Sequence, residues 1–223
     1  NRTVLNSVLG ISWFWFYGSV FILQIFAYAK HYLGGDEQLV STLLALFIIG
    51  ISTGSILCER LSSGRVEIGL VPFGAFGLTL FGLDLFFATP EQAPANLSML
   101  QFLSQSEYWR ITFDLLMVGI FGGFYTVPLY ALVQQRSDPM RRSRVIAGNN
   151  ILNALFMVIS ALYTMLLLGP LNLSIPELFL VTAVINAAVA VYIFTLVPEF
   201  MMRFMVWILI HAMYCLLYTS DAA

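Results

Sequence analysis

Two aspartates lie inside stretches that are otherwise apolar, where a charged side chain is costly. Asp84 is in the run LFGLDLFFA, and Asp114 lies in a second long apolar run. A charge at the centre of a bilayer costs roughly 2.5–3.5 kcal/mol on insertion scales, so such residues usually face a protein interior or a wet cavity. Both aspartates are about one turn from the ends of their runs, which reduces this cost. Asp84 and Asp114 are therefore candidate substrate-binding or ion-coupling residues.

Arg110 precedes Asp114 by four residues, which places the two side chains on the same face of a helix. Asp114 accordingly has two interpretations, a structural ion pair with Arg110 or a role in transport. For Asp84 the sequence offers no nearby partner, which favours a functional role.

Three amides form a second polar group, at the start of a later apolar run. Asn149, Asn150 and Asn153 follow the basic segment 141–144. An unpaired polar group in hydrocarbon costs several kcal/mol, so these amides need partners. Hydrogen bonds to neighbouring helices are one interpretation, and coordination of a lipid head group is the other.

Small residues gather in VGIFGGFYTVP, where Gly119, Gly122 and Gly123 precede Pro128. Small side chains let membrane helices approach closely, and a proline can bend a span. The pattern fits either a helix that bends during transport or a plain packing face. The tryptophans near the span ends, Trp13 among them, are interpreted as interface anchors.

The sequence lacks the residue types that catalysis in this segment would need. Its two histidines, His31 and His211, fall on opposite faces of the predicted membrane threading and cannot share a site. Cys58 and Cys215 are far apart in apolar runs, which predicts neither a disulfide nor a thiolate metal site. We expect no catalytic residue, metal or cofactor here. A net charge of -2 with only ten basic residues also argues against a nucleic-acid partner.

The elements that must position these residues follow from composition. Of the 223 residues, 60% are hydrophobic and 10% are charged, with a mean hydropathy of +0.88. An ordinary water-soluble domain carries about 25% charged residues, so the bilayer is the expected solvent. A span needs roughly 20 mostly apolar residues, and the runs do not alternate as barrel strands do. We predict an all-α membrane domain with spans near 9–30, 38–60, 66–88, 110–135, 145–168 and 176–197.

Most arginines fall on one side of this threading, whereas Lys30 and Arg110 fall on the other. Basic residues in short loops resist translocation, so the arginine-rich side is predicted to be cytoplasmic, with both termini there. The loop 89–109 is expected to carry a short helix within ANLSMLQFLSQ, on the outer face.

The ends suggest a piece of a longer chain. The sequence opens on Asn1 without a secretory signal, which we interpret as a cut. After the six-helix domain, 1–198, the stretch 199–218 is predicted to be a cytoplasmic interfacial helix rather than a seventh span, because its polar residues share one broad face. We interpret the last residues, 219–223, as a non-native tail.

Longer stretches of the sequence resemble a known transporter family. GGFYTVPLYALVQQRS and RSRVIAGNNILNALFMVISAL, with the segments around them, are similar to the second half of bacterial lysophospholipid-transporter-type members of the major facilitator superfamily. The similarity covers roughly residues 5–212 and is greatest to the form fused to an acyltransferase and an acyl-ACP or acyl-CoA synthetase. It implies twelve helices in two halves, of which this chain holds the C-terminal six.

A loop signature adds to the resemblance. Glu59-Arg60 and Gly64-Arg65 in ERLSSGR resemble the acidic-basic and Gly-basic pairs that join two cytoplasmic helix ends in this superfamily, although three residues separate the pairs instead of one. The resemblance implies a conformational latch, in which Glu59 pairs with a basic group in one state and releases it in the other. The alternative is an ordinary basic turn.

The resemblance implies movement of lysophospholipid across the bacterial inner membrane for reacylation. The partners implied are membrane lipid, a missing N-terminal six-helix half and a downstream acyltransferase domain. The alternative is a membrane platform that docks a fused lipid acyltransferase and transports nothing itself. Replacing the domain with an unrelated anchor would distinguish the two.

Overall fold

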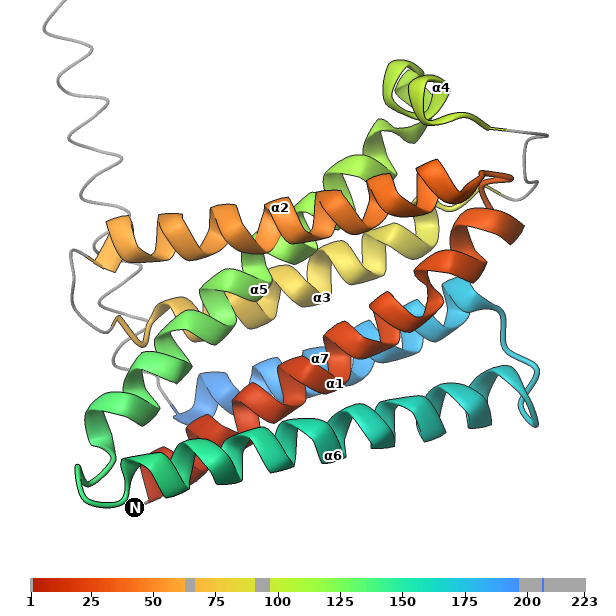
Figure 1. The fold of residues 1–223 in the computed structure, drawn as a ribbon. Coiled ribbons are helices and arrows are strands. Elements are labelled where there is room, and N and C mark those ends of the chain that lie inside the picture. Colours follow the sequence, from red (N-terminus) through yellow and green to blue (C-terminus); the bar gives the residue numbers. More distant parts are fainter. Residues whose placement is uncertain (1, 63–66, 91–96, 197–205, 207–223) are drawn as a thin grey trace, which may run out of the picture.

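The computed structural model describes residues 2–62, 67–90, 97–196 and 206. Within these ranges the chain is helical, apart from turns and one isolated bridge between Gly35 and Leu97 (Figure 1). The long helices are α1 (Arg2–His31), α2 (Glu37–Ser62), α3 (Leu70–Ala88), α5 (Trp109–Arg136), α6 (Arg142–Leu168) and α7 (Ile175–Leu196). Two short elements, α4 (Met99–Ser104) and the 3-10 turn η1 (Ser106–Tyr108), precede α5.

Six described helices are long and apolar enough to cross a membrane. Even the shortest, α3, has 19 residues and would extend about 28 Å at 1.5 Å per residue, close to the thickness of the hydrocarbon core. A helix satisfies its own backbone hydrogen bonds, which hydrocarbon cannot do for it. The chain is therefore an all-α protein with the build of a multi-pass membrane domain.

The helix bounds follow the predicted spans closely, with the largest difference in α1. This helix begins at Arg2 rather than near residue 9. Its first turns are polar and so lack the apolar signal, yet the helix continues through them, and the Ser7 hydroxyl donates back to the Thr3 carbonyl at 2.9 Å. The predicted helix before α5 is also present as α4, capped reciprocally by Ser98 and Gln101. Segments 199–218 and 219–223 lie outside the described residues.

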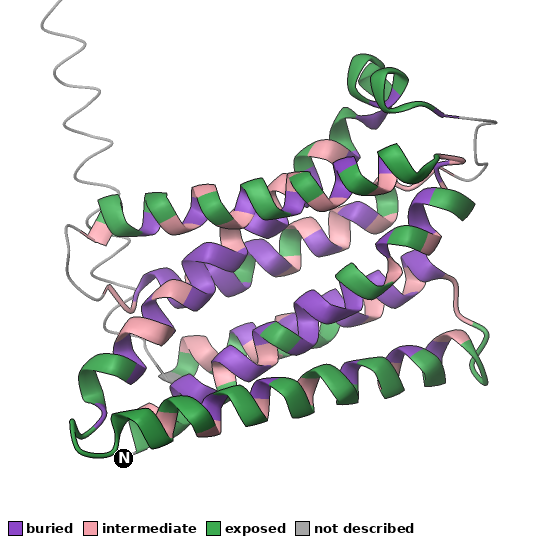
Figure 2. Cartoon of the chain, viewed as in Figure 1, coloured by how far each residue is buried: buried purple, intermediate pink, exposed green. Residues whose placement is uncertain are grey.

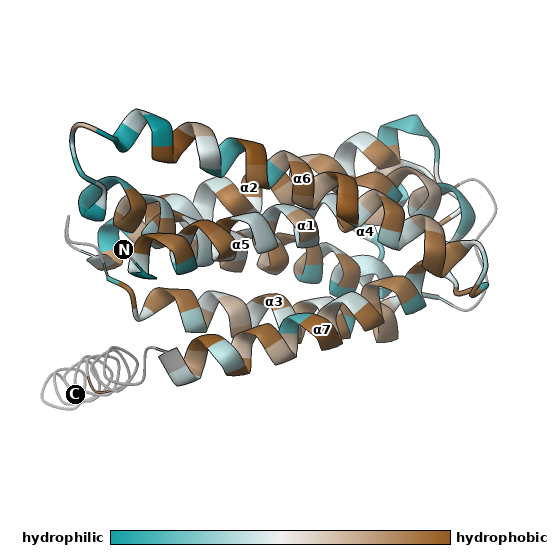
Figure 3. Ribbon diagram, turned by 90° about the horizontal axis from the view of Figure 1, so that it is seen from below, coloured by the Kyte–Doolittle hydropathy of each residue, from teal (hydrophilic) through white to brown (hydrophobic). Residues whose placement is uncertain are grey.

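The helices form three layers, which lie one above another in the view of Figure 3. Helices α2 and α6 make one outer layer, α1 and α5 the middle, and α3 and α7 the other outer layer. The middle helices are the most enclosed, and the buried core, including Tyr17, Phe21 and Tyr125, lies along them.

The packing partners are exchanged between the two halves of the chain. One half consists of α1, α2 and α3, and the other of α5, α6 and α7. The first helix of each half packs on the second helix of the other, α1 on α6 and α5 on α2. The third helices, α3 and α7, pack on each other. Because the helices alternate in direction, α1 and α5 run oppositely (Figure 1). This exchange is the arrangement expected of two inverted three-helix repeats.

Glycines bring α2 and α5 into backbone contact. Gly50 and Gly54 of α2 face Gly119 and Gly123 of α5. A Cβ atom on Gly119 would lie 2.8 Å from the Gly50 Cα, and one on Gly123 would lie 2.7 Å from the Ser55 nitrogen. The predicted close approach of the Gly119 segment is thus present, and its partner is a matching small-residue pair four apart on α2.

The outer faces of α2 and α6 are apolar and uncovered within the described structure. Figure 2 shows exposed residues along most of α6 and much of α2. The exposed apolar side chains include Ile48, Ile49 and Ile56 on α2, and Ile151, Val158 and Leu162 on α6. An apolar surface of this extent requires lipid or another protein surface against it.

The two ends of the bundle differ in charge. We call one the basic end, which carries Arg2, Arg60, Arg136, Arg141, Arg142 and Arg144, together with Glu59, Glu67 and Asp138. We call the other the acidic end, which carries Asp36, Glu37, Asp84, Glu107 and Glu177, together with Lys30 and Arg110.

Candidate functional site

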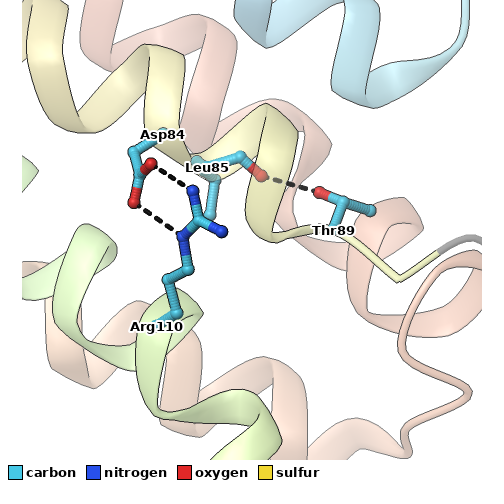
Figure 4. A network of polar contacts seen from close by, with 4 residues as sticks. All are labelled: Asp84, Leu85, Thr89 and Arg110. Carbon is cyan, nitrogen blue, oxygen red and sulfur yellow. Dashed lines mark hydrogen bonds and ion pairs between the residues drawn. The ribbon is translucent and has the colours of Figure 1, made fainter.

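An ion pair joins α3 to α5 near the acidic end. The Arg110 guanidinium holds both carboxylate oxygens of Asp84, with Nε donating to Oδ2 at 2.9 Å and Nη2 donating to Oδ1 (Figure 4). The end of α3 is anchored in turn, because Thr89 donates to the Leu85 carbonyl at 2.8 Å and lies 3.0 Å from the Tyr28 hydroxyl of α1. Asp84 therefore projects from a helix end whose position is set by two neighbouring helices.

This pairing differs from the one that the sequence suggested. One of the two interpretations of Asp114 paired it with Arg110 on the same helix, and the sequence offered no nearby partner for Asp84. Arg110 instead reaches across to Asp84, 26 residues away in the chain, because α3 packs along α5 and brings the carboxylate beside its first turn. The local four-residue spacing carried no information about this second helix.

Asp114 is consequently left buried without a hydrogen bond. Its exposed fraction is 0%, and neither carboxylate oxygen has a hydrogen-bond partner among the described residues. The charged or titratable groups that interact with it are Asp84 of α3, Arg110 of its own helix and Tyr28 of α1. A carboxyl group so placed is costly unless it takes up a proton or meets a cation. Chemically, Asp114 is thus suited to bind a proton or a small cation.

We expect Arg110 to form an ion pair with Asp114 when Asp84 is replaced. The Asp84–Arg110 pair is partly exposed, so Asp84→Asn should cost less than about 1 kcal/mol of stability. In that variant Arg110 can turn to Asp114, four residues on. Asp84→Asn with Asp114→Asn should then destabilise the protein by more than the sum of the single changes. Thermal unfolding in detergent measures this cycle, and strict additivity would contradict this ion pair.

A polar network near the basic half joins α1, α5 and α6. Ser12 lies 2.9 Å from the side-chain amide of Asn153, and the Trp15 indole donates to the Tyr130 hydroxyl at 3.0 Å. When the side-chain amide of Asn153 is rotated so that its oxygen and nitrogen exchange places, the oxygen accepts from the Asn149 side-chain amide at 3.2 Å. Asn153 therefore links helices, as one of the two sequence interpretations held.

The three predicted amides do not form one site. Asn149 is buried and its Oδ1 has no hydrogen-bond partner within the described part of the chain, whereas Asn150 is exposed. Beside Asn149 is a cavity of about 500 Å³ at the basic end. Its lining combines Arg136, Arg141 and the acidic Asp138 with the apolar side chains of Val8 and Leu152. A free acceptor, two cations and apolar walls are compatible with a lipid head group.

The predicted latch residues are only partly described. Glu59 and Arg60 lie in the last turn of α2, are exposed, and form no ion pair with any other described residue. Gly64 and Arg65 fall outside the described residues, so the latch stays a prediction.

A set of hydrogen bonds that joins α1, α3 and α7 was not predicted from the sequence. The Trp13 indole, interpreted as an interface anchor, instead donates to Asn186 Oδ1 at 2.8 Å inside the bundle. Asn186 is fully buried and donates to the Ala75 carbonyl at 3.0 Å and to Thr79 at 2.9 Å. A lone asparagine inside an apolar run was the available signal, since such an amide must find partners.

Comparison of the chain with protein-family models, curated proteins and solved structures finds no match in any of the three.

Proposed function

We propose that this chain is one half of a major-facilitator-type transporter that moves lysophospholipid across the bacterial inner membrane for reacylation. The observation that carries the proposal is the exchange of packing partners, α1 with α6 and α5 with α2. In this superfamily each six-helix half contains two inverted three-helix repeats, and the substrate site lies between the two six-helix halves. The resemblance of the sequence to this family, described above, supplies the substrate class.

The uncovered layer suggests where the second half docks. Helices α2 and α6 expose apolar faces along their length and are the least buried of the six, with α7 only slightly more enclosed and α3 much more so. A missing N-terminal half seated on the α2 and α6 layer would enclose a conduit lined by the middle helices, α1 and α5. Rocking of one half against the other would then open the conduit to each side in turn.

The polar residues have distinct roles in this proposal. The cavity beside Asn149 would receive the head group near the basic end, with Arg136 and Arg141 facing the phosphate. Asp114, buried and without a hydrogen bond, would bind a proton or cation during the cycle. Arg110 would alternate between Asp84 and Asp114. A downstream acyltransferase would consume the lysophospholipid on the cytoplasmic side, where both termini of the chain would lie.

Reconstitution of the intact protein in lipid vesicles tests the proposal. We expect protein-dependent transfer of a labelled lysophospholipid between leaflets, well above that of empty vesicles. Replacing residues 1–198 with an unrelated membrane anchor should abolish transfer. If transfer is absent from the intact protein, or if reacylation of lysolipid supplied outside survives the replacement, the domain is a platform and not a transporter.

A further inference from the structure

A second cavity lies on the other side of the middle layer, among α1, α3, α5 and α7. It has a volume of about 390 Å³ and opens at the basic end. Its apolar walls are formed by Ile68, Val71, Leu129, Leu132 and Ile193. This volume falls in the range of small-molecule sites, roughly 300–1,000 Å³. No residue of α2 or α6 is among the described residues that line it.

Two cations face this cavity without a counter-charge. Arg2 of α1 and Arg136 of α5 line it, and no acidic residue is among the lining side chains. Neither arginine forms an ion pair with any residue that the structure describes. Guanidinium groups from two helices, converging on one space, are suited to a phosphate or carboxylate, and a planar fork of donors fits phosphate oxygens in particular.

A buried hydroxyl supplies an independent sign of a ligand. Tyr125 has an exposed fraction of 0% and lines the cavity, yet its hydroxyl has no hydrogen-bond partner in the described structure. The hydroxyl lies against Gly10, where an added Cβ atom would be 3.3 Å from it. A buried phenolic hydroxyl normally finds a partner, because leaving it unsatisfied costs about 1–3 kcal/mol.

The arginine side chains and the Tyr125 hydroxyl lie in different parts of the cavity. Tyr125 and Arg136 are eleven residues apart on α5, about 16 Å along the helix axis at 1.5 Å per residue. The apolar side chains lie between them. A ligand that satisfies both ends must carry an anionic group, a hydrogen-bonding group and apolar surface. A free inorganic ion would leave the apolar walls and the hydroxyl unused.

We propose that this cavity binds a phosphate-bearing glycerolipid of the leaflet at the basic end, with the phosphate at Arg2 and Arg136 and an ester or hydroxyl group bonded to Tyr125. Arg136 also lines the cavity beside Asn149, but Arg2 and Tyr125 line only this one, so Tyr125→Phe separates binding here from binding at the proposed head-group site.

Equilibrium binding to the intact protein, purified in detergent, tests the site. The probe is lysophosphatidic acid, compared with the monoacylglycerol of the same chain length and with glycerol 3-phosphate. We expect lysophosphatidic acid to bind at least tenfold more tightly than either. The double variant Arg2→Gln, Arg136→Gln should lose at least 30-fold in affinity, because two charge-assisted contacts are removed. Tyr125→Phe should lose about five- to tenfold.

Arg144→Gln is the matched control, because this arginine lies at the same end, is exposed and lines neither cavity. Its affinity should equal that of the wild type, and circular dichroism should show that each variant keeps its helices. Equal binding of the monoacylglycerol would overturn the phosphate assignment, and equal binding of glycerol 3-phosphate would overturn the lipid assignment. Loss of binding in the double variant with none in Tyr125→Phe would place the ligand in the other cavity and refute the proposal.

Discussion

Gly54→Ala is expected to destabilise the protein by about 2–3 kcal/mol, although alanine is the better helix former. The added Cβ atom would lie 2.8 Å from the Cα of Ile120, and the neighbour is backbone that cannot rotate away. Helices α2 and α5 would have to separate, which loosens the contact that joins one outer layer to the middle one. Unfolding of the purified protein by denaturant in mixed micelles measures the loss.

Gly148→Ala is the control for this prediction. A Cβ atom there meets nothing within 4 Å, so the same chemical change should be neutral or stabilise the protein by up to about 1 kcal/mol. Gly119→Ala, on the facing helix, should resemble Gly54→Ala because its Cβ atom would lie 2.8 Å from the Gly50 Cα. Equal stability of the Gly54 and Gly148 variants would show that the helices do not touch at these glycines.

Asp114→Asn is expected to reduce lysophospholipid transport at least tenfold without lowering thermal stability. The wild-type carboxyl group is buried and has no hydrogen bond among the described residues, so removing its charge relieves a cost of folding. If the same group binds a proton or cation during the transport cycle, the amide cannot replace it. Stability and activity should therefore change in different directions, as is common where a functional group is kept at the expense of stability.

Glu107→Gln is the control for Asp114→Asn. Glu107 lies at the same end of the bundle and is exposed, so its substitution should leave both the transport rate and the melting temperature unchanged. A wild-type transport rate in Asp114→Asn would remove this carboxyl group from the mechanism. A fall in melting temperature of several degrees would instead indicate that Asp114 has a structural partner.

The number and type of the helices could be predicted from the sequence because they depend on local composition. A run of about 20 apolar residues must satisfy its own backbone hydrogen bonds in lipid, and a helix does so without reference to any other segment. The start of α1 was misplaced for the same reason, since the polar residues at Arg2–Ser7 give no apolar signal while the helix continues through them.

The close approach at Gly119 was also predictable, but its partner was not. Small residues indicate that a helix can be approached, and the spacing of Gly50 and Gly54 in GISTG carries the same signal on α2. Which of several such faces meet depends on the packing of all six helices at once.

The partners of the polar side chains are what the sequence could not predict. The sequence determined that Asp84, Asp114, Arg110, Asn149 and Asn153 lie in or beside membrane helices, where each must find a partner. Only the tertiary structure decided that Arg110 holds Asp84, that Asp114 is left buried, and that Tyr125 faces a cavity with two arginines. The physical reason is that membership of a helix is set by neighbours in the chain, whereas the partner of a polar group is set by the helix that packs beside it.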